Sequence, residues 1–142
     1  MSNNDGATAR PTIHVVAAAL YDAQGRVLIA ERPPGKHLSG GWEFPGGKID
    51  AGETERQALA RELAEELGVQ VDACHPLLHV AHDYDDRRVE ISLWVVTGYS
   101  GVPAGLDGQR LRWVPPAKLA ACDMLAADVP FIAALQALYN DA

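Results

Sequence analysis

The pattern of apolar and polar residues predicts short strands interrupted by two longer helices. Residues 13–20 form an apolar run with β-branched members, which is typical of a buried strand. Residues 22–25 have the composition of a turn, so residues 27–30 are expected to return beside the first strand as a β-hairpin. Further strands are expected at residues 42–44, 77–84, 89–96 and 111–114.

Helical spacing appears in two places. Leu59, Leu63 and Leu67 recur every fourth residue and predict an amphipathic helix that Thr54 begins and Gly68 ends. A short helical turn is expected at residues 117–120, and a second amphipathic helix after Pro130. Strands interleaved with two main helices indicate an α/β domain in layers, with a mixed sheet.

Composition narrows the class of protein. The 142 residues are enough for one domain, expected at residues 12–142 behind a flexible tail at 1–11. With 48% hydrophobic and 22% charged residues, and no apolar run near the ~20 that a membrane span needs, the chain should be soluble without a membrane partner. Cys74 and Cys122 have neither disulfide nor metal-ligand spacing, so free thiols in a reducing cytoplasm are expected. The oligomeric expectation is a monomer or a homodimer.

The net charge of −7 argues against nucleic acid as a partner, because nucleic acid attracts a basic surface. It does not exclude an anionic small molecule, since bound metal ions can supply positive charge locally.

Three carboxylates gather on the first helix. Glu62, Glu65 and Glu66 stand at i, i+3 and i+4, so their side chains share one face. Like charges at this spacing cost roughly 0.2–0.5 kcal/mol per pair, and a divalent cation would reverse the sign. Hard cations such as Mg²⁺ or Mn²⁺ prefer such oxygen ligands. The alternative is the solvated face of an ordinary amphipathic helix.

The spacing around these glutamates matches a known signature. It reads Gly47, five residues, Glu53, seven residues, Arg61-Glu62, an aliphatic, any residue, Glu65-Glu66, any residue, Gly68 and an aliphatic. This stretch resembles the signature of the Nudix hydrolases, and Trp-Glu-Phe-Pro-Gly-Gly-Lys at residues 42–48 resembles their MutT-like branch, the nucleoside triphosphate pyrophosphohydrolases. The resemblance covers residues 13–138. It implies an α/β/α sandwich around a central mixed β-sheet, and Mg²⁺-dependent release of a nucleoside monophosphate and pyrophosphate, with Mn²⁺ as a possible substitute.

The resemblance also implies roles for the residues of the signature. Glu62, Glu65 and Glu66 would hold the metal with the Gly47 carbonyl. Glu53 would ligate through water or orient a ligand. Arg61 would pair with a carboxylate and hold the helix geometry, the alternative being a surface ion pair.

Five further residues carry implied roles that stay open. Asp107 stands where MutT-like enzymes carry a glutamate that binds metal or activates water; it is one methylene shorter, and an Asp-Gly turn is the alternative. Arg32 would contact the nucleotide and Lys48 a phosphate, although either could be a solvated cation. Phe44 would border the base pocket. Asp128 replaces an asparagine that reads the purine edge, and it could instead cap the last helix.

Asp128 leaves the substrate open between oxidised nucleotides such as 8-oxo-dGTP and cytidine nucleotides. An ionised aspartate only accepts hydrogen bonds, as from the exocyclic amine of cytosine, whereas a protonated one could still read an oxidised guanine. A dinucleoside polyphosphate or a nucleotide sugar is also open as substrate, and so is a ligand-sensing Nudix domain without catalysis.

Overall fold

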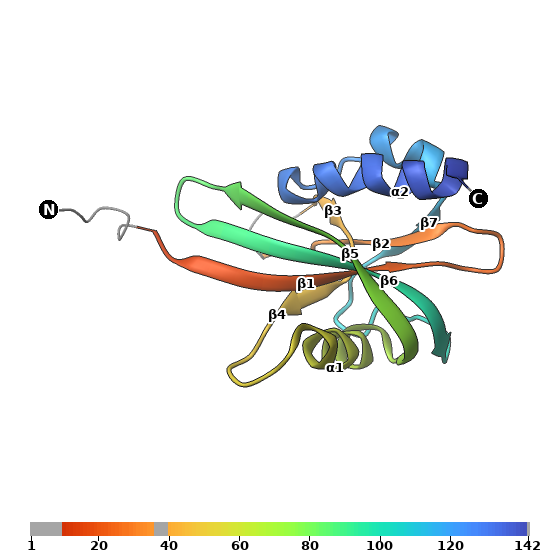
Figure 1. The fold of residues 1–142 in the computed structure, drawn as a ribbon, viewed down its shortest axis with the longest axis horizontal. Helices are drawn as coiled ribbons and strands as arrows, with labels where there is room; N and C mark the ends of the chain where they lie inside the picture. Colours follow the sequence, from red (N-terminus) through yellow and green to blue (C-terminus); the bar gives the residue numbers. More distant parts are fainter. Residues whose placement is uncertain (1–9, 36–39, 142) are drawn as a thin grey trace, which may run out of the picture.

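Two β-sheets lie between two long helices, which cover opposite faces (Figure 1). A computed structural model describes residues 10–35 and 40–141 of the chain. The strands are β1 (Thr12–Leu20), β2 (Val27–Glu31), β3 (Trp42–Glu43), β4 (Gly46–Lys48), β5 (Gln70–Asp83), β6 (Arg88–Ser100) and β7 (Leu111–Val114). The helices are α1 (Glu55–Leu67), α2 (Val129–Asp141) and the 3₁₀ turns η2 (Pro116–Ala121) and η3 (Ala126–Asp128).

The larger sheet has the strand order β4-β1-β6-β5. β1 runs parallel to β6 and antiparallel to β4, while β5 and β6 form a long antiparallel hairpin. The expected mixed sheet is therefore confirmed. The smaller sheet, β3-β2-β7, is entirely antiparallel.

The expected hairpin between the first two strands is wrong. Asp22 does organise the predicted turn, because its Oδ1 accepts the N–H groups of Gln24 and Arg26. Beyond one bridge between Tyr21 and Val27, however, β1 and β2 enter different sheets. Residues 16–20 of β1 are buried on both faces, so this strand takes a central place with a neighbour on each edge.

The strand expected at residues 77–84 begins seven residues earlier, at Gln70. Asp72, His75 and Pro76 interrupt the apolar pattern over that stretch. β5 is an edge strand with irregular register against β6, and such a strand tolerates both polar side chains and a proline.

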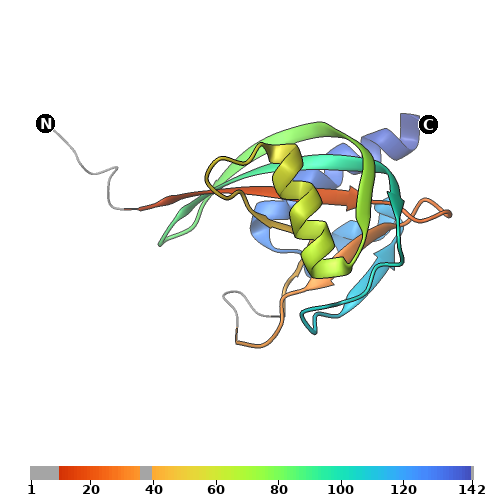
Figure 2. The same cartoon turned by 90° about the horizontal axis from the view of Figure 1, so that it is seen from below.

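The core divides into two layers, one on each face of the strands. Val16, Ala18 and Leu20 of β1 point toward α1, whereas Ala17 and Ala19 point toward α2. This alternation fixes the register of β1 and, through it, the position of β4 beside the C-terminal half of α1. Figure 2 shows α1 lying across the strands of the larger sheet.

Helix α1 begins and ends where the sequence predicts. Thr54 and Gln57 form a capping box, in which each side chain accepts the other residue's backbone N–H. Gly68 ends the helix in the left-handed region at φ 72°. No helix in the described part of the chain is long and apolar enough to cross a membrane.

The last two residues of the expected tail, Arg10 and Pro11, form hydrogen bonds with the folded domain. Arg10 donates to the Tyr84 carbonyl oxygen and lies 3.2 Å from Asp83, and the Pro11 carbonyl accepts the Arg88 N–H. Residues 1–9 lie outside the described residues.

Truncating the apolar stripe of α1 tests this packing. Leu63 is fully buried between α1 and the larger sheet, whereas Leu138 of α2 is 39% exposed. We expect Leu63→Ala to lower the free energy of unfolding by about 2–5 kcal/mol, because it leaves a cavity. Leu138→Ala should change it by only about 0.5 kcal/mol. Urea unfolding followed by circular dichroism measures both, and equal losses would contradict the assigned packing.

Candidate active site

Helix α1 presents its acidic face to the short strand β4. Gly47 has no room for a side chain, because a Cβ there would collide with the Glu62 carboxyl group. A Cβ on Gly46 would collide with the backbone of Val16 in β1. The two glycines therefore let the carboxylates of α1 approach the sheet backbone directly.

Glu62 and Glu66 meet at this place and share a hydrogen bond. Burial, followed by the nearby charge of Glu62, raises the pKa of Glu66 to about 8, against a backbone hydrogen bond from Gly46. Burial also raises the pKa of Glu62, opposed by Arg61. Two partly buried carboxylates in contact favour a bound cation, so this donor set fits a divalent metal.

Arg61 ties the surrounding acids together. Its Nε lies 2.7 Å from Glu53 Oε2, and its Nη2 donates to Glu53 Oε1 at 2.9 Å and to the Lys48 carbonyl at 3.0 Å. Its Nη1 lies 3.2 Å from both Glu62 and Glu65. The hydrogen bonds that Glu53 accepts from Arg61 and from the Asp50 N–H lower the pKa of Glu53 to about 2. The pKa of Arg61 rises, chiefly through its hydrogen bond with Glu53.

Glu65 stands apart from the other two carboxylates in this arrangement. Its side chain is 61% exposed and contacts Arg61. Among the described residues, no group of three or more His, Cys, Asp or Glu side chains is arranged to hold a metal ion together. To join Glu62 and Glu66 around a cation, Glu65 would have to leave Arg61.

A cleft of about 660 Å³ opens beside the glutamates. Its lining includes Glu62, Glu66 and Asp107, together with Gly47 and Lys48. Apolar residues of β1 and β6 line the wall. These are Ile13, Val15, Val16, Ala17, Val89 and Ile91.

Polar groups line another part of the cleft. Asp128 is only 5% exposed, and its Oδ2 accepts the Phe44 N–H at 3.0 Å. Burial, followed by the charge of Glu43, raises the pKa of Asp128 to about 7. Arg32 Nε lies 3.2 Å from Glu43 Oε2, close enough for an ion pair although it lacks hydrogen-bond geometry. Burial raises the pKa of Glu43, and Arg32 opposes it.

The sequence-predicted residues thus reach the cleft to different degrees. It is lined by Arg32, Phe44, Gly47, Lys48, Glu62, Glu66, Asp107 and Asp128. Phe44 is buried and packs edge-on against Phe131 of α2, while Lys48 and Asp107 are exposed. Glu53, Arg61 and Glu65 are not among the lining residues. Glu53 forms an ion pair with Arg61, which in turn contacts Glu62 and Glu65.

The sequence analysis assigned no role here to Glu43 and Arg87, yet both line the cleft, as does Tyr84. Glu43 lies inside the Trp-Glu-Phe strand, where alternation could have signalled a face different from that of its neighbours. Arg87 and Tyr84 come from the β5–β6 turn, whose charged composition reads as ordinary solvent-facing residues.

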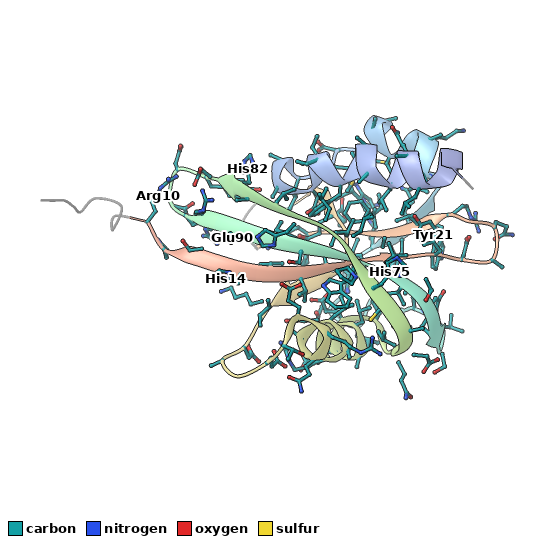
Figure 3. The ribbon with its side chains drawn as sticks, in the orientation of Figure 1. Arg10, His14, Tyr21, His75, His82 and Glu90 are labelled. Atoms are coloured by element: carbon teal, nitrogen blue, oxygen red, sulfur yellow. The ribbon has the colours of Figure 1, made fainter. Side chains whose placement is uncertain are left out.

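Among the described residues, the histidines belong to no group that could hold a metal ion. His14, His75 and His82 are spread along the larger sheet (Figure 3). His79 contacts Ser92 at 2.8 Å and Glu90 at 3.2 Å. His37 lies outside the described residues.

Comparison with known proteins shows which family the chain belongs to. A model of the NUDIX domain matches residues 16–134. The 8-oxo-dGTP diphosphatase of Proteus vulgaris is 47% identical over 85 residues, which cover 60% of this chain and 76% of that protein. The CTP pyrophosphohydrolase of Escherichia coli K12 is 33% identical, over 87% of this chain and 91% of that protein.

A solved structure shares the fold as well. A MutT structure, from work on the proteins of Aliivibrio salmonicida and Vibrio cholerae, superposes with a TM-score of 0.78 at 36% identity, covering 89% of this chain and 98% of that one. The expected Nudix architecture is thereby confirmed. With a family match across most of its length and the acidic helix set against paired glycines, the chain belongs to the NUDIX domain family, as a MutT-like Nudix hydrolase.

Proposed function

We propose that this protein is a Mg²⁺-dependent nucleoside triphosphate pyrophosphohydrolase that acts on oxidised nucleotides such as 8-oxo-dGTP. The observation that carries the proposal is the pairing of Glu62 and Glu66 against Gly46 and Gly47 in one part of a cleft that also contains the buried Asp128. Several relatives, among them the Proteus vulgaris protein, bear the name 8-oxo-dGTP diphosphatase, which supports this substrate. Removal of oxidised nucleotides before their incorporation would be the cellular role, in the cytoplasm.

Metal binding falls to the acids of α1. Glu62 and Glu66, with the Gly47 carbonyl and with Glu65 once released from Arg61, would hold the cation. When bound there, a divalent cation lowers the pKa of water and neutralises charge on phosphate oxygens. Arg61 and Glu53 keep the helix and the β4 segment in register. Arg32, Lys48 and Arg87 supply positive charge along the cleft toward an anionic substrate.

The nucleotide base would lie against Phe44 and the apolar wall, within reach of Asp128. With a pKa of about 7, Asp128 would be neutral in about half of the molecules at pH 7. The neutral form can donate a hydrogen bond as well as accept one. To recognise the edge of an oxidised purine as an asparagine does, the side chain must both donate and accept a hydrogen bond.

The second candidate substrate is a cytidine nucleotide. An ionised Asp128 could accept from the exocyclic amine of cytosine. The similarity to the E. coli CTP pyrophosphohydrolase, which extends over most of both chains, favours this candidate.

Pyrophosphate release with Mg²⁺, compared across 8-oxo-dGTP, dGTP, CTP, dCTP and 5-methyl-dCTP, tests the proposal. A preference for 8-oxo-dGTP, abolished by a chelator, is the expected result. A preference for the cytidine nucleotides would select the second candidate. No turnover of any triphosphate at any metal concentration would contradict the proposal, and would leave a dinucleoside polyphosphate or nucleotide sugar substrate, or a ligand-sensing domain.

Replacing Glu66 by Gln tests the metal assignment. The change keeps the size of the side chain but removes a ligand charge, so we expect kcat to fall about 100-fold or more, beyond the range typical for residues that only support a ligand. Asp72→Asn is the matched control, because Asp72 is an exposed acid on β5 outside the cleft-lining set. Turnover of Glu66→Gln within a few-fold of the unchanged protein would rule out the assigned role.

The pH dependence of kcat/KM tests whether Asp128 recognises the base. Glu43 from β3, Arg32 after β2 and Tyr84 at the end of β5 carry the charged and titratable groups that face it. Below pH 7 its carboxyl is mostly neutral and can donate; above pH 7 it ionises and only accepts. We expect kcat/KM for 8-oxo-dGTP, divided by that of Asp128→Asn, to fall about fivefold from pH 7 to pH 8, since the neutral fraction drops from about one half to one tenth.

Asparagine donates at every pH, so the division removes dependences shared by both proteins, such as that of the attacking water. A ratio that is constant from pH 6 to pH 8.5 would contradict a donor role for Asp128. A ratio that rises with pH would indicate that the ionised form is the one that binds.

A further inference from the structure

The side chain of Gln109 joins two segments at the metal-binding part of the cleft. Its Oε1 accepts the Asp107 N–H at 2.8 Å, and its Nε2 donates to the Glu66 carbonyl at 3.2 Å. We propose that Gln109 is a positioning residue, whose amide holds Asp107 at the end of helix α1 so that the Asp107 carboxylate can serve the metal site. This inference rests on the proposed function.

The loop between β6 and β7 is docked on the C-terminal end of α1 (Figure 2). The Ala104 N–H donates to the Leu67 carbonyl at 3.0 Å, and the Leu106 N–H donates to the Glu66 carbonyl at 3.0 Å. These bonds satisfy two carbonyls that the last turn of the helix leaves without intrahelical partners. The loop is therefore part of the end of the helix, although it comes from another region of the chain.

Asp107 lies at the apex of a tight turn within this loop. The Gly108 N–H donates to the Gly105 carbonyl at 3.1 Å, and Gly108 has φ +81°. A Cβ on Gly105 would collide with the Gln109 carbonyl oxygen, so the turn folds closely on itself. Backbone bonds fix the flanks of the turn, whereas the Asp107 N–H is bound by the Gln109 side chain.

The contact between Gln109 and Asp107 matters because the aspartate side chain is short. Asp107 and Gln109 line the same cleft as Glu62 and Glu66, yet Asp107 is exposed and one methylene shorter than a glutamate. A shorter side chain depends more on where its backbone is held. The Gln109 amide connects that backbone to the carbonyl of Glu66, one of the proposed metal ligands.

The amide provides both ends of this connection through two different atoms, an acceptor oxygen and a donor nitrogen. Gln109→Met keeps the length and loses both bonds. Gln109→Glu keeps the acceptor for the Asp107 N–H but loses the donor to the helix end. Comparing the two variants separates the connection as a whole from its loop half.

A double-mutant cycle tests the inference. Gln109→Met, Asp107→Asn and the double variant are compared for kcat, for the Mg²⁺ concentration at half-maximal rate, and for Mn²⁺ binding by electron paramagnetic resonance without substrate. We expect each single change to weaken Mn²⁺ binding and raise the half-saturating Mg²⁺ about tenfold. Metal affinity of the double variant should lie within about twofold of that of the single variant with the lower affinity, because both changes remove the same function. Gln109→Glu should behave as Gln109→Met.

Gln136→Met is the matched control. Its Nε2 donates to the Pro116 carbonyl at 3.2 Å, so this change also removes a side-chain amide bond to a carbonyl, but on α2 outside the cleft-lining set. It should leave metal dependence unchanged. Circular dichroism establishes a temperature at which all variants are folded.

Three outcomes would overturn the inference. Effects of Gln109→Met and Asp107→Asn that multiply would mean that Gln109 acts on the helix end independently of Asp107. Metal affinity unchanged in either single variant would remove the coupling, and a Gln109→Glu variant equal to the unchanged protein would show that the helix contact is dispensable. Failure of the proposed function is distinguishable, because an absence of pyrophosphate release leaves the Mn²⁺ cycle readable.

Discussion

The structure depends on the close approach of an acidic helix to a strand that begins with two glycines. A Cβ at Gly47 would occupy the place of the Glu62 carboxyl, and one at Gly46 would enter the backbone of β1. The absence of side chains at these positions lets the carboxylates of the helix approach the strand backbone. Two partly buried carboxylates, Glu62 and Glu66, meet there, which is favourable for a hard cation and costly for the carboxylates alone.

Arg61 sets how much of that cost is balanced within the protein. It contacts Glu53, Glu62 and Glu65, and also the Lys48 carbonyl at the end of β4. Glu53 is firmly ionised beside it, whereas the pKa of Glu66 is raised because burial and Glu62 outweigh its stabilising contacts. Arg61 thus holds the acids around the site in place, while Glu62 and Glu66, whose pKa values are raised, face the cleft.

The signature helix was predictable because its determinants are local. Thr54, Gln57 and Gly68 specify both ends, and Leu59 and Leu63 specify the buried side, all within one short stretch of sequence. The β1–β2 hairpin failed for the opposite reason: the turn at Asp22 is local, but the partners of β1 are chosen by long-range burial. The roles of Glu43 and Gln109 could not be predicted, because they come from neighbours distant in the sequence, Asp128 in one case and Glu66 in the other.

Chemistry in the cleft gives a direction to the proposed substrate. The glutamates of α1 would repel a polyphosphate without a cation, whereas Phe44 and the apolar wall offer nothing to phosphate and much to a planar base. Asp128 adds a single buried group that can specify a base edge. In the proposed function, a triphosphate would gain from both sets of residues with its phosphates toward Glu66 and its base toward Asp128. In that orientation metal affinity and base choice reside in different elements, α1 and η3, so a change in base preference at Asp128 need not alter the residues that carry the hydrolysis.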